Sequence, residues 1–333
     1  PGSPFQILQR TDTFGLVDGV TVYGGFDGSE TYFTQRQLDS HPTILSGDIN
    51  GDDTSGQYSD NVYHVVSAQG VKEWAVLDGF YIKDGYADLK QSYRDMGGGM
   101  ICDNASPIIR NCTFDYNHAE TSGGAVYCVN SSTPLFRNCS FTNNNTWKHG
   151  AAVFNNSSEP VFVGCSFEYN YLTVAGSHGG AVHNAGCGLE LTFISCYFYA
   201  NHANEAGGAV YNNNSEPSFY NCIFSQNFAN TNGGAILNSD SNIKVVNCTL
   251  YGNYAYNLTG GIHNTGSSVP EIQNTIIWNN CHGNCSSSLT EDSQVYSVGT
   301  SPAITYSRIQ GWTGALGGAG NSGEDPKLVL PSM

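Results

Sequence analysis

The chain has 333 residues and a formal net charge of −16, with 28 Asp plus Glu against 12 Lys plus Arg. This charge excludes nucleic acid as a partner, because neutralising phosphates requires a basic face. No apolar run reaches the roughly 18 residues of a transmembrane helix. The acidic composition, poor in Lys and rich in Asn, Ser, Thr and Gly, is typical of a secreted protein that is extracellular or at the cell surface.

Residues 1–96 are predicted to form the first coils of a repetitive β structure with protruding loops. Short apolar runs within residues 15–48, 61–66 and 76–82 predict strands. Polar stretches at 46–61 and 83–96 predict loops between them.

The first of these loops carries oxygen-bearing side chains at close spacing: Asp48, Asn50, Asp52 and Asp53. This spacing is typical of a Ca²⁺-binding loop, although the distal bidentate Glu is missing. The alternative interpretation is a solvated Asp/Gly turn. Calcium is the only cofactor that the sequence indicates.

Residues 97–283 repeat one short phrase seven times. Each copy begins with a glycine pair, or Gly-Ala, and a short apolar run, and these recur every 25 to 29 residues. A second apolar run follows, with a Cys and, five residues later, an Asn. The cysteine position is occupied by Cys112, Cys139, Cys165, Cys196, Cys222, Cys248 and, in the seventh copy, Thr275. The asparagines are Asn117, Asn144, Asn170, Asn201, Asn227, Asn253 and Asn280.

A fixed period of this length indicates one structural unit stacked on copies of itself. The apolar runs are four to six residues long and rich in Val, Ile, Phe and Tyr, which favours strands over helices. Such short strands bury a core only by pairing with the same strand of the next unit. The sequence therefore predicts an all-β, right-handed parallel β-helix of about 27 residues per coil and roughly 10 coils. We expect one domain over 1–333: N-terminal coils (1–96), regular repeats (97–283), and a C-terminal coil and loop (284–333).

In such a stack, equivalent residues lie above one another. The cysteines are expected to form an inward column of small side chains. The asparagines are expected at tight turns, where Asn tolerates the left-handed backbone region and its amide bonds along the stack. A second Asn column follows the glycine strand, with Cys102 and Cys128 in the same position of the first two coils.

Two disulfides are compatible with the spacing. Cys281 and Cys285 could close a small loop, and Cys102 and Cys128 lie one coil apart, within bridging distance of their Cα atoms. Zinc is not expected, because stacked thiols form a line rather than a tetrahedron.

An outward column of rings follows the Asn column at Tyr171, His202, Phe228 and Tyr254. Sugar rings stack on aromatic faces, so this column is a candidate glycan-binding platform. The alternative interpretation is ordinary aromatic packing along the surface. Asn-x-Ser/Thr sequences, such as those at Asn130 and Asn213, are compatible with a glycoprotein.

Catalysis is the weaker alternative. A polysaccharide lyase or hydrolase acting on an acidic glycan needs a base beside a charge neutraliser, or paired carboxylates. Within the repeats, Glu159 and Glu216 share a position two coils apart, which is far for such a pair. Arg110 and Arg137 would form a small basic step. These residues are interpreted as surface turns.

The pairing of Gly-Gly-Ala-[Val/Ile] with Phe-x-x-Asn, as in Phe114–Asn117 and Phe141–Asn144, is a recognisable signature. It resembles the repeat of chlamydial polymorphic outer-membrane proteins and of bacterial right-handed β-helix surface proteins. The resemblance covers 97–283 and implies an exported, displayed protein that contacts glycans, cells or matrix. We therefore predict a non-catalytic adhesin or, since open β-helix ends invite another chain, a subunit of a head-to-tail filament.

Overall fold

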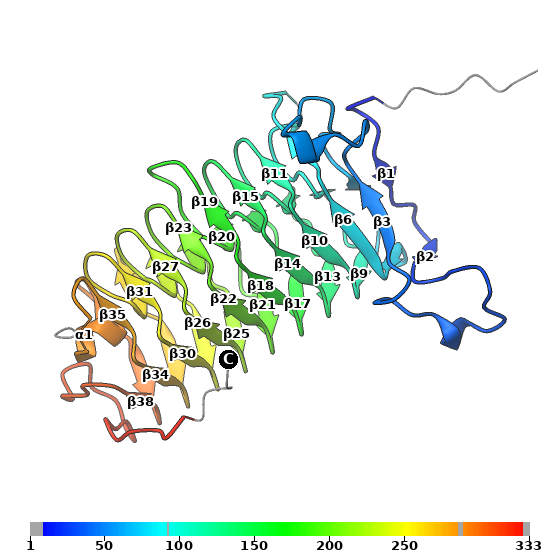
Figure 1. The fold of residues 1–333 in the computed structure, drawn as a ribbon. Coiled ribbons are helices and arrows are strands. Elements are labelled where there is room, and N and C mark those ends of the chain that lie inside the picture. Colours follow the sequence, from blue (N-terminus) through cyan, green and yellow to red (C-terminus); the bar gives the residue numbers. More distant parts are fainter. Residues whose placement is uncertain (1–8, 92, 286–288, 329–333) are drawn as a thin grey trace, which may run out of the picture.

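The computed structural model describes residues 9–91, 93–285 and 289–328. The chain is a parallel β-solenoid, so the predicted fold class is confirmed. Figure 1 shows the coils stacked in chain order as an elongated body. Within the described residues, helix is limited to α1 (Glu291–Gln294) and two 3₁₀ turns, Phe33–Gln35 and Asp53–Ser55. None of these helices is long and apolar enough to cross a membrane.

The coils build four parallel sheets, named A to D in chain order; each coil contributes one strand to sheets A, B and C, and all but the first and last of the described coils also contribute one to sheet D. Sheet A contains β1 (Phe14–Gly15), β4 (Val66–Gln69), β8 (Met100–Asp103), β12 (Val126–Val129), β16 (Val153–Asn156), β20 (Val182–Ala185), β24 (Val210–Asn213), β28 (Ile236–Ser239), β32 (Ile262–Thr265) and β36 (Val295–Ser297). Sheet B contains β2 (Thr21–Tyr23), β5 (Val76–Asp78), β9 (Ile108–Arg110), β13 (Leu135–Arg137), β17 (Val161–Val163), β21 (Thr192–Ile194), β25 (Ser218–Tyr220), β29 (Lys244–Val246), β33 (Glu271–Gln273) and β37 (Ala303–Thr305).

The other two sheets complete the wall. Sheet C contains β3 (Thr43–Ser46), β6 (Phe80–Lys83), β10 (Thr113–Asp115), β14 (Ser140–Thr142), β18 (Ser166–Glu168), β22 (Tyr197–Tyr199), β26 (Ile223–Ser225), β30 (Thr249–Tyr251), β34 (Ile276–Trp278) and β38 (Arg308–Ile309). Sheet D contains β7 (Tyr86–Ala87), β11 (His118–Ala119), β15 (Asn145–Thr146), β19 (Tyr171–Leu172), β23 (His202–Ala203), β27 (Phe228–Ala229), β31 (Tyr254–Ala255) and β35 (Cys281–His282).

The regular part of the solenoid has about 7 turns about 27 residues apart, which is fewer than the roughly ten coils predicted. The further strands of each sheet come from less regular segments at either end, whose sequences lack the repeated phrase. A solenoid tolerates such variation because each coil contacts only its neighbours.

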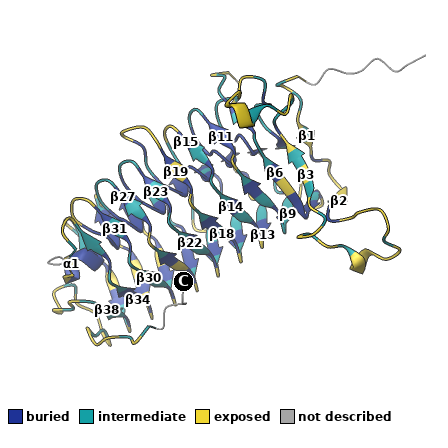
Figure 2. Ribbon diagram, viewed as in Figure 1, coloured by how far each residue is buried: buried dark blue, intermediate teal, exposed yellow. Residues whose placement is uncertain are grey.

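The core is built from two columns of stacked phenylalanines. Neighbouring ring centroids lie 4.5 to 5.0 Å apart, close to the spacing of paired strands. The columns consist of Phe136, Phe162, Phe193 and Phe219 on sheet B, and Phe114, Phe141, Phe167, Phe198 and Phe224 on sheet C. Figure 2 shows buried residues following the coils and exposed residues gathering on the loops.

The asparagine ladder joins the coils through side-chain amides. Asn170 is buried and accepts hydrogen bonds from the backbone N–H (3.0 Å) and Nδ2 (3.1 Å) of Asn144. Its own Nδ2 donates to the Phe141 carbonyl and to Asn201 Oδ1, both at 2.9 Å. The same pattern runs from Asn117 to Asn280. The ladder predicted from the repeat is therefore confirmed.

The predicted backbone geometry of the ladder asparagines is wrong. The left-handed residue is the one before each of them, for example Tyr116 (φ 52°), Asn143 (φ 52°) and Tyr169 (φ 55°). The ladder Asn is needed for its amide, which bonds across the turn and along the stack. The left-handed residue before it is free to vary because its side chain points away from the core.

The cysteine column is buried, and its thiols donate to backbone carbonyls. Cys222 Sγ lies 3.4 Å from the carbonyl oxygens of Phe193 and Tyr220. Thr275 makes the same contacts in the seventh copy, where Oγ1 donates to Val245 (3.3 Å) and Gln273 (2.9 Å). This explains how Thr replaces Cys at a fully buried position.

Of the two disulfides considered, the structure contains Cys281–Cys285, with an S–S distance of 2.03 Å. The other possible bridge, Cys102–Cys128, does not form, because both residues are free and buried. They are paired in register on β8 and β12, so their Cβ atoms project in parallel and keep the strand spacing of about 4.8 Å. A disulfide needs Cβ atoms about 3.5–4.5 Å apart.

Near the N-terminal end, the segment 24–42 leaves the stack as a protruding loop (Figure 1). A buried ion cluster fastens it: Asp78 accepts from Arg36 Nη2 at 2.6 Å and from Arg110 Nε at 2.7 Å. At the other end, Trp312 and Leu316 pack against the core.

Candidate ligand-binding sites

The four predicted glycan-binding residues form one line on sheet D. Strand pairing places Tyr171 beside His202, His202 beside Phe228, and Phe228 beside Tyr254. The rings of Phe228 and Tyr254 stack at 5.3 Å, and His202 meets Phe228 edge-on at 4.7 Å. Tyr171 is 41% exposed and the other three are half-buried. The four rings thus lie on consecutive coils, and Tyr171 is the most exposed of them.

The ring column, defined as these four residues, has a counterpart further toward the N-terminus that the prediction missed. Tyr58 stacks on Tyr86 at 5.5 Å, Tyr86 stacks on His118 at 4.5 Å, and Trp147 lies against His118 at 5.9 Å. Asn145 follows His118 in the strand register. Tyr58 and Tyr86 precede the regular repeats, so the repeated phrase does not signal their alignment.

The predicted calcium loop brings three carboxylates together. One oxygen each from Asp48, Asp52 and Asp53 lies within 4.8 Å of the others. Asp48 accepts the backbone N–H groups of Gly51 (2.7 Å) and Asp52 (3.2 Å), which shapes the loop. Asn50 contributes a backbone N–H to Asp60 at 3.0 Å.

Burial raises the pKa of Asp53 to about 6, and the neighbouring Asp48, Asp84 and Asp60 charges add to the shift. One side-chain oxygen each of Asp52 and Asp53 is enclosed without a hydrogen-bond partner. Mutually repelling carboxylates with unpaired oxygens fit a hard cation such as Ca²⁺, which takes oxygen ligands.

A second cluster was not predicted. Asp27, Glu30 and His41 offer ligand atoms within 4.8 Å of one another. Glu30 is oriented by the backbone N–H groups of Asp27 (2.8 Å) and Gly28 (2.9 Å). His41 lies 11 residues from Glu30 and reaches it only because the 24–42 loop folds back. No spacing rule in the sequence signals this.

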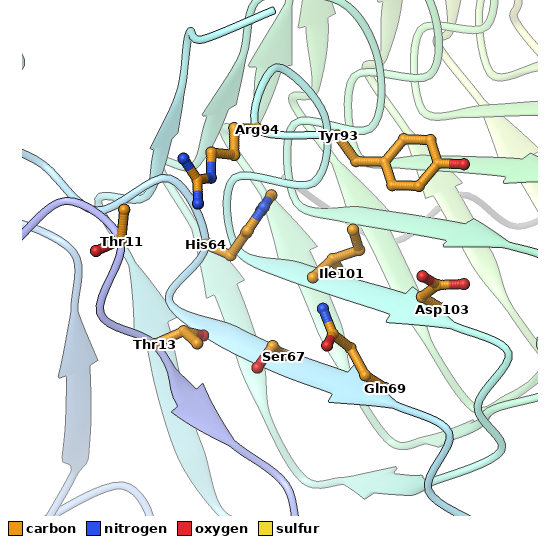
Figure 3. Close-up of a pocket in the computed structure, with 9 residues that line it drawn as sticks. All are labelled: Thr11, Thr13, His64, Ser67, Gln69, Tyr93, Arg94, Ile101 and Asp103. Atoms are coloured by element: carbon orange, nitrogen blue, oxygen red, sulfur yellow. The ribbon is translucent and has the colours of Figure 1, made fainter. Parts of the chain in front are cut away.

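A cavity lies on the outer face of sheet A, near its N-terminal end (Figure 3). Its volume is about 680 Å³. Its lining residues come from four chain segments: Thr11, Thr13, His64, Ser67, Gln69, Tyr93, Arg94, Ile101 and Asp103. We call this the polar pocket. No motif in the sequence signals this pocket, because its residues span more than ninety positions.

Two groups in the polar pocket are held in defined states. His64 Nδ1 donates to the Gly97 carbonyl at 2.9 Å, which leaves Nε2 as an acceptor. Burial, and then the Arg94 charge, lowers the pKa of His64, so the ring is neutral at pH 7. Asp103 accepts from Asn130 Nδ2 at 2.7 Å.

A further set of histidines lies on sheet A. Strand register places Tyr127, Phe154, His183 and Tyr211 in one outward column. His183 packs against Phe154 (4.9 Å) and Tyr211 (4.8 Å) and against the adjacent His149 (4.7 Å). Burial lowers the pKa of His149 to about 4 and that of His183 well below its usual value. These uncharged rings serve as aromatic packing.

Two of the four residues weighed for catalysis, Arg110 and Glu159, are engaged in other contacts. Arg110 is neutralised by Asp78, so only Arg137 carries a free charge at the expected basic step. Glu159 accepts the backbone N–H of Gly188 at 3.0 Å. Neither arrangement resembles an acid–base pair poised on a substrate.

Two stretches of the chain match known families. Residues 61–192 match a right handed beta helix region, and residues 221–239 match the Chlamydia polymorphic membrane protein repeat. Comparison with curated proteins and with solved structures gave no significant match. The resemblance predicted from the repeats is thus confirmed: the chain is similar to right-handed β-helix proteins with chlamydial-type repeats. The chlamydial-type repeat indicates a surface-associated protein.

Proposed function

We propose that this protein is a secreted, non-catalytic adhesive β-helix that binds glycans through the ring column on sheet D. The observation that carries the proposal is the alignment of Tyr171, His202, Phe228 and Tyr254 on consecutive coils. Coils repeat about every 4.8 Å, close to the length of one sugar unit in an extended chain. Successive sugars can therefore meet successive rings.

The rest of the molecule supports this role by holding the rings in place. The ladder below them is fully hydrogen-bonded, so the rings sit on a rigid face. A preorganised face binds with little loss of conformational entropy. The many polar side chains around the column suit hydroxyl-rich ligands.

The test is a glycan array followed by calorimetry on the binders found. We expect Tyr254→Ala and Phe228→Ala each to weaken binding about tenfold, since ring contacts contribute roughly 0.5–1.5 kcal/mol each beyond burial. Tyr32→Ala is the matched control, because Tyr32 is 72% exposed but lies on the 24–42 loop. Equal binding by all variants, or release of reducing or unsaturated ends from a polysaccharide, contradicts the proposal.

A head-to-tail filament is the second structural proposal. Strands β1, β2 and β3 each have a partner on one side only. At the opposite end, sheet C is already extended, because Ile309 N–H donates to the Ser322 carbonyl at 3.0 Å. Negative-stain electron microscopy, with and without EDTA, tests this proposal. Long fibres support the filament, and isolated short rods oppose it.

A further inference from the structure

We propose that the polar pocket binds a carboxylate-bearing sugar, with Arg94 receiving the carboxylate and Asp103 and Gln69 receiving hydroxyl groups. The proposal rests on the glycan-binding function but assigns a second site, separate from the ring column. Different variants therefore test the polar pocket and the ring column. The pocket volume of about 680 Å³ accommodates one or two sugar units rather than a simple small acid.

Arg94 is the cation of the pocket lining, and it remains available for a ligand. Arg10, Arg36, Arg110 and Arg308 all pair with carboxylates, whereas no described residue forms a salt bridge with Arg94. Its guanidinium lies 5.6 Å from the centre of the Tyr63 ring, which restricts its position. A guanidinium held in this way offers two parallel donors to a carboxylate.

The rest of the lining suits a polyol. Ser67 and Gln69 on β4 pair in register with Ile101 and Asp103 on β8, so their side chains share the outer face. His64 offers a neutral acceptor nitrogen between them and Arg94. Figure 3 shows Arg94 and Asp103 toward opposite sides of the pocket. A carboxylate at one side and hydroxyls at the other match this polarity.

Apolar contact comes from two further side chains. Ile101 is buried beneath the pocket, and Tyr93, which packs against Tyr127 at 5.7 Å, stands at its edge. Sugars present C–H faces that pack on such groups. A phosphate monoester would bring close to two negative charges, and the pocket lining contains one cation.

The experiment is calorimetric titration of the purified chain with a galacturonate trimer and with the matching neutral galactose trimer. We expect the uronate trimer to bind and the neutral trimer to bind at least tenfold more weakly. Arg94→Gln should weaken uronate binding at least tenfold, and Asp103→Asn should weaken it less. Arg137→Gln is the matched control, an exposed arginine on sheet B. Circular dichroism and melting temperature verify that each variant is folded.

Variants of the ring column separate this proposal from the function on which it rests. Tyr254→Ala should leave uronate binding unchanged. Uronate binding that survives Arg94→Gln, or that is lost in Tyr254→Ala, overturns the pocket assignment while leaving the adhesive function standing. Equal affinity for the two trimers, or no binding of either, also overturns it. Uronate binding that Arg94→Gln abolishes, together with no effect of the column variants on any glycan, supports the pocket and removes the column.

Discussion

The regular repeats (97–283) and the N-terminal region before them use the same coil for different ends. In the repeats, nearly every inward position is copied from coil to coil and its polar atoms are bonded along the stack. Before residue 97, the chain leaves the stack in long loops, and both clusters of potential metal ligands and most of the polar pocket lie there. Repetition supplies rigidity, and departures from it supply chemistry.

The sharpest test of this contrast is Asn170→Ala in the ladder. The substitution removes the acceptor of Asn144 and the donor to Phe141 and leaves buried groups unpaired. We expect a loss of about 3 kcal/mol in the free energy of unfolding, because each unsatisfied buried group costs roughly 1–3 kcal/mol. Urea denaturation measures it. Asn204→Ala, at a partly exposed amide, should cost under ~1 kcal/mol; similar losses would contradict the ladder's role.

Acid should destabilise the repeats through their buried histidines. The folded-state pKa of His149, about 4, lies below the unfolded value of roughly 6.5. The unfolded chain therefore binds protons first, so stability is full above about pH 6.5 and falls as the pH approaches 4. We expect the free energy of unfolding to fall by about 2 kcal/mol between pH 7 and pH 4.5. Thermal melts at each pH measure this loss.

The matched variants for that prediction are His183→Phe and His41→Gln. Phe154 occupies the adjoining position of the sheet A column, so phenylalanine fits there. His183 faces His149 and His178, whose pKa values are also lowered by burial. The Glu205 charge near His178 opposes this lowering at His178. His183→Phe should reduce the acid sensitivity, whereas the half-exposed His41 should not influence it. Unchanged sensitivity in His183→Phe would refute the assignment.

In the N-terminal region, Asp53→Asn should act in the opposite sense. The raised pKa of Asp53, about 6, means that its ionisation opposes folding above that pH and not below about pH 4. In EDTA at pH 7.5 the variant should be slightly more stable than the parent. The gain in the free energy of unfolding should be under ~1 kcal/mol, because solvent screens the site. The gain should vanish near pH 4.

Calcium should reverse this order of stability, so that the parent becomes more stable than Asp53→Asn. Added Ca²⁺ should raise the melting temperature of the parent by binding the folded state, and Asp53→Asn should lose most of this gain. Asp39→Asn, an exposed carboxylate outside both clusters, should behave as the parent does. A parent protein that is indifferent to Ca²⁺ would mark the Asp48 loop as a solvated turn.

The smallest effect is expected for Cys222→Ser. Serine can donate to the Phe193 and Tyr220 carbonyls as the thiol does, and Thr275 does so natively. We expect a change below ~1 kcal/mol in the free energy of unfolding, measured in urea under reducing conditions. A loss as large as that of Asn170→Ala would show that the column needs sulfur for more than packing.

The repeats were predictable because identical positions recur and stacking forces them into register. The repeat alone predicts the Asn ladder and the line from Tyr171 to Tyr254. The left-handed residue is not predictable in this way, since a turn's φ angles depend on which neighbour faces inward. The Cys102–Cys128 bridge is compatible with the Cα spacing but not with the direction of the side chains.

The polar pocket and the Asp27 cluster could not be predicted in the same way. His41 meets Asp27 because Arg36 anchors the loop to Asp78, a contact across 42 residues. The pocket joins Thr11 to Asp103 through strand pairing at the irregular end of sheet A. Neither leaves a periodic trace, because each occurs once.

The free thiols inside the coil have a consequence for the history of the molecule. Nine cysteines are buried and unbridged, so the fold shields them from oxidants in solution. For Cys112, burial also raises the pKa to about 12. A molecule that unfolds in an oxidising medium exposes all nine thiols. Non-native disulfides then form between cysteines that lie in one column in the folded state. Denaturation under such conditions is irreversible, and refolding requires a reductant.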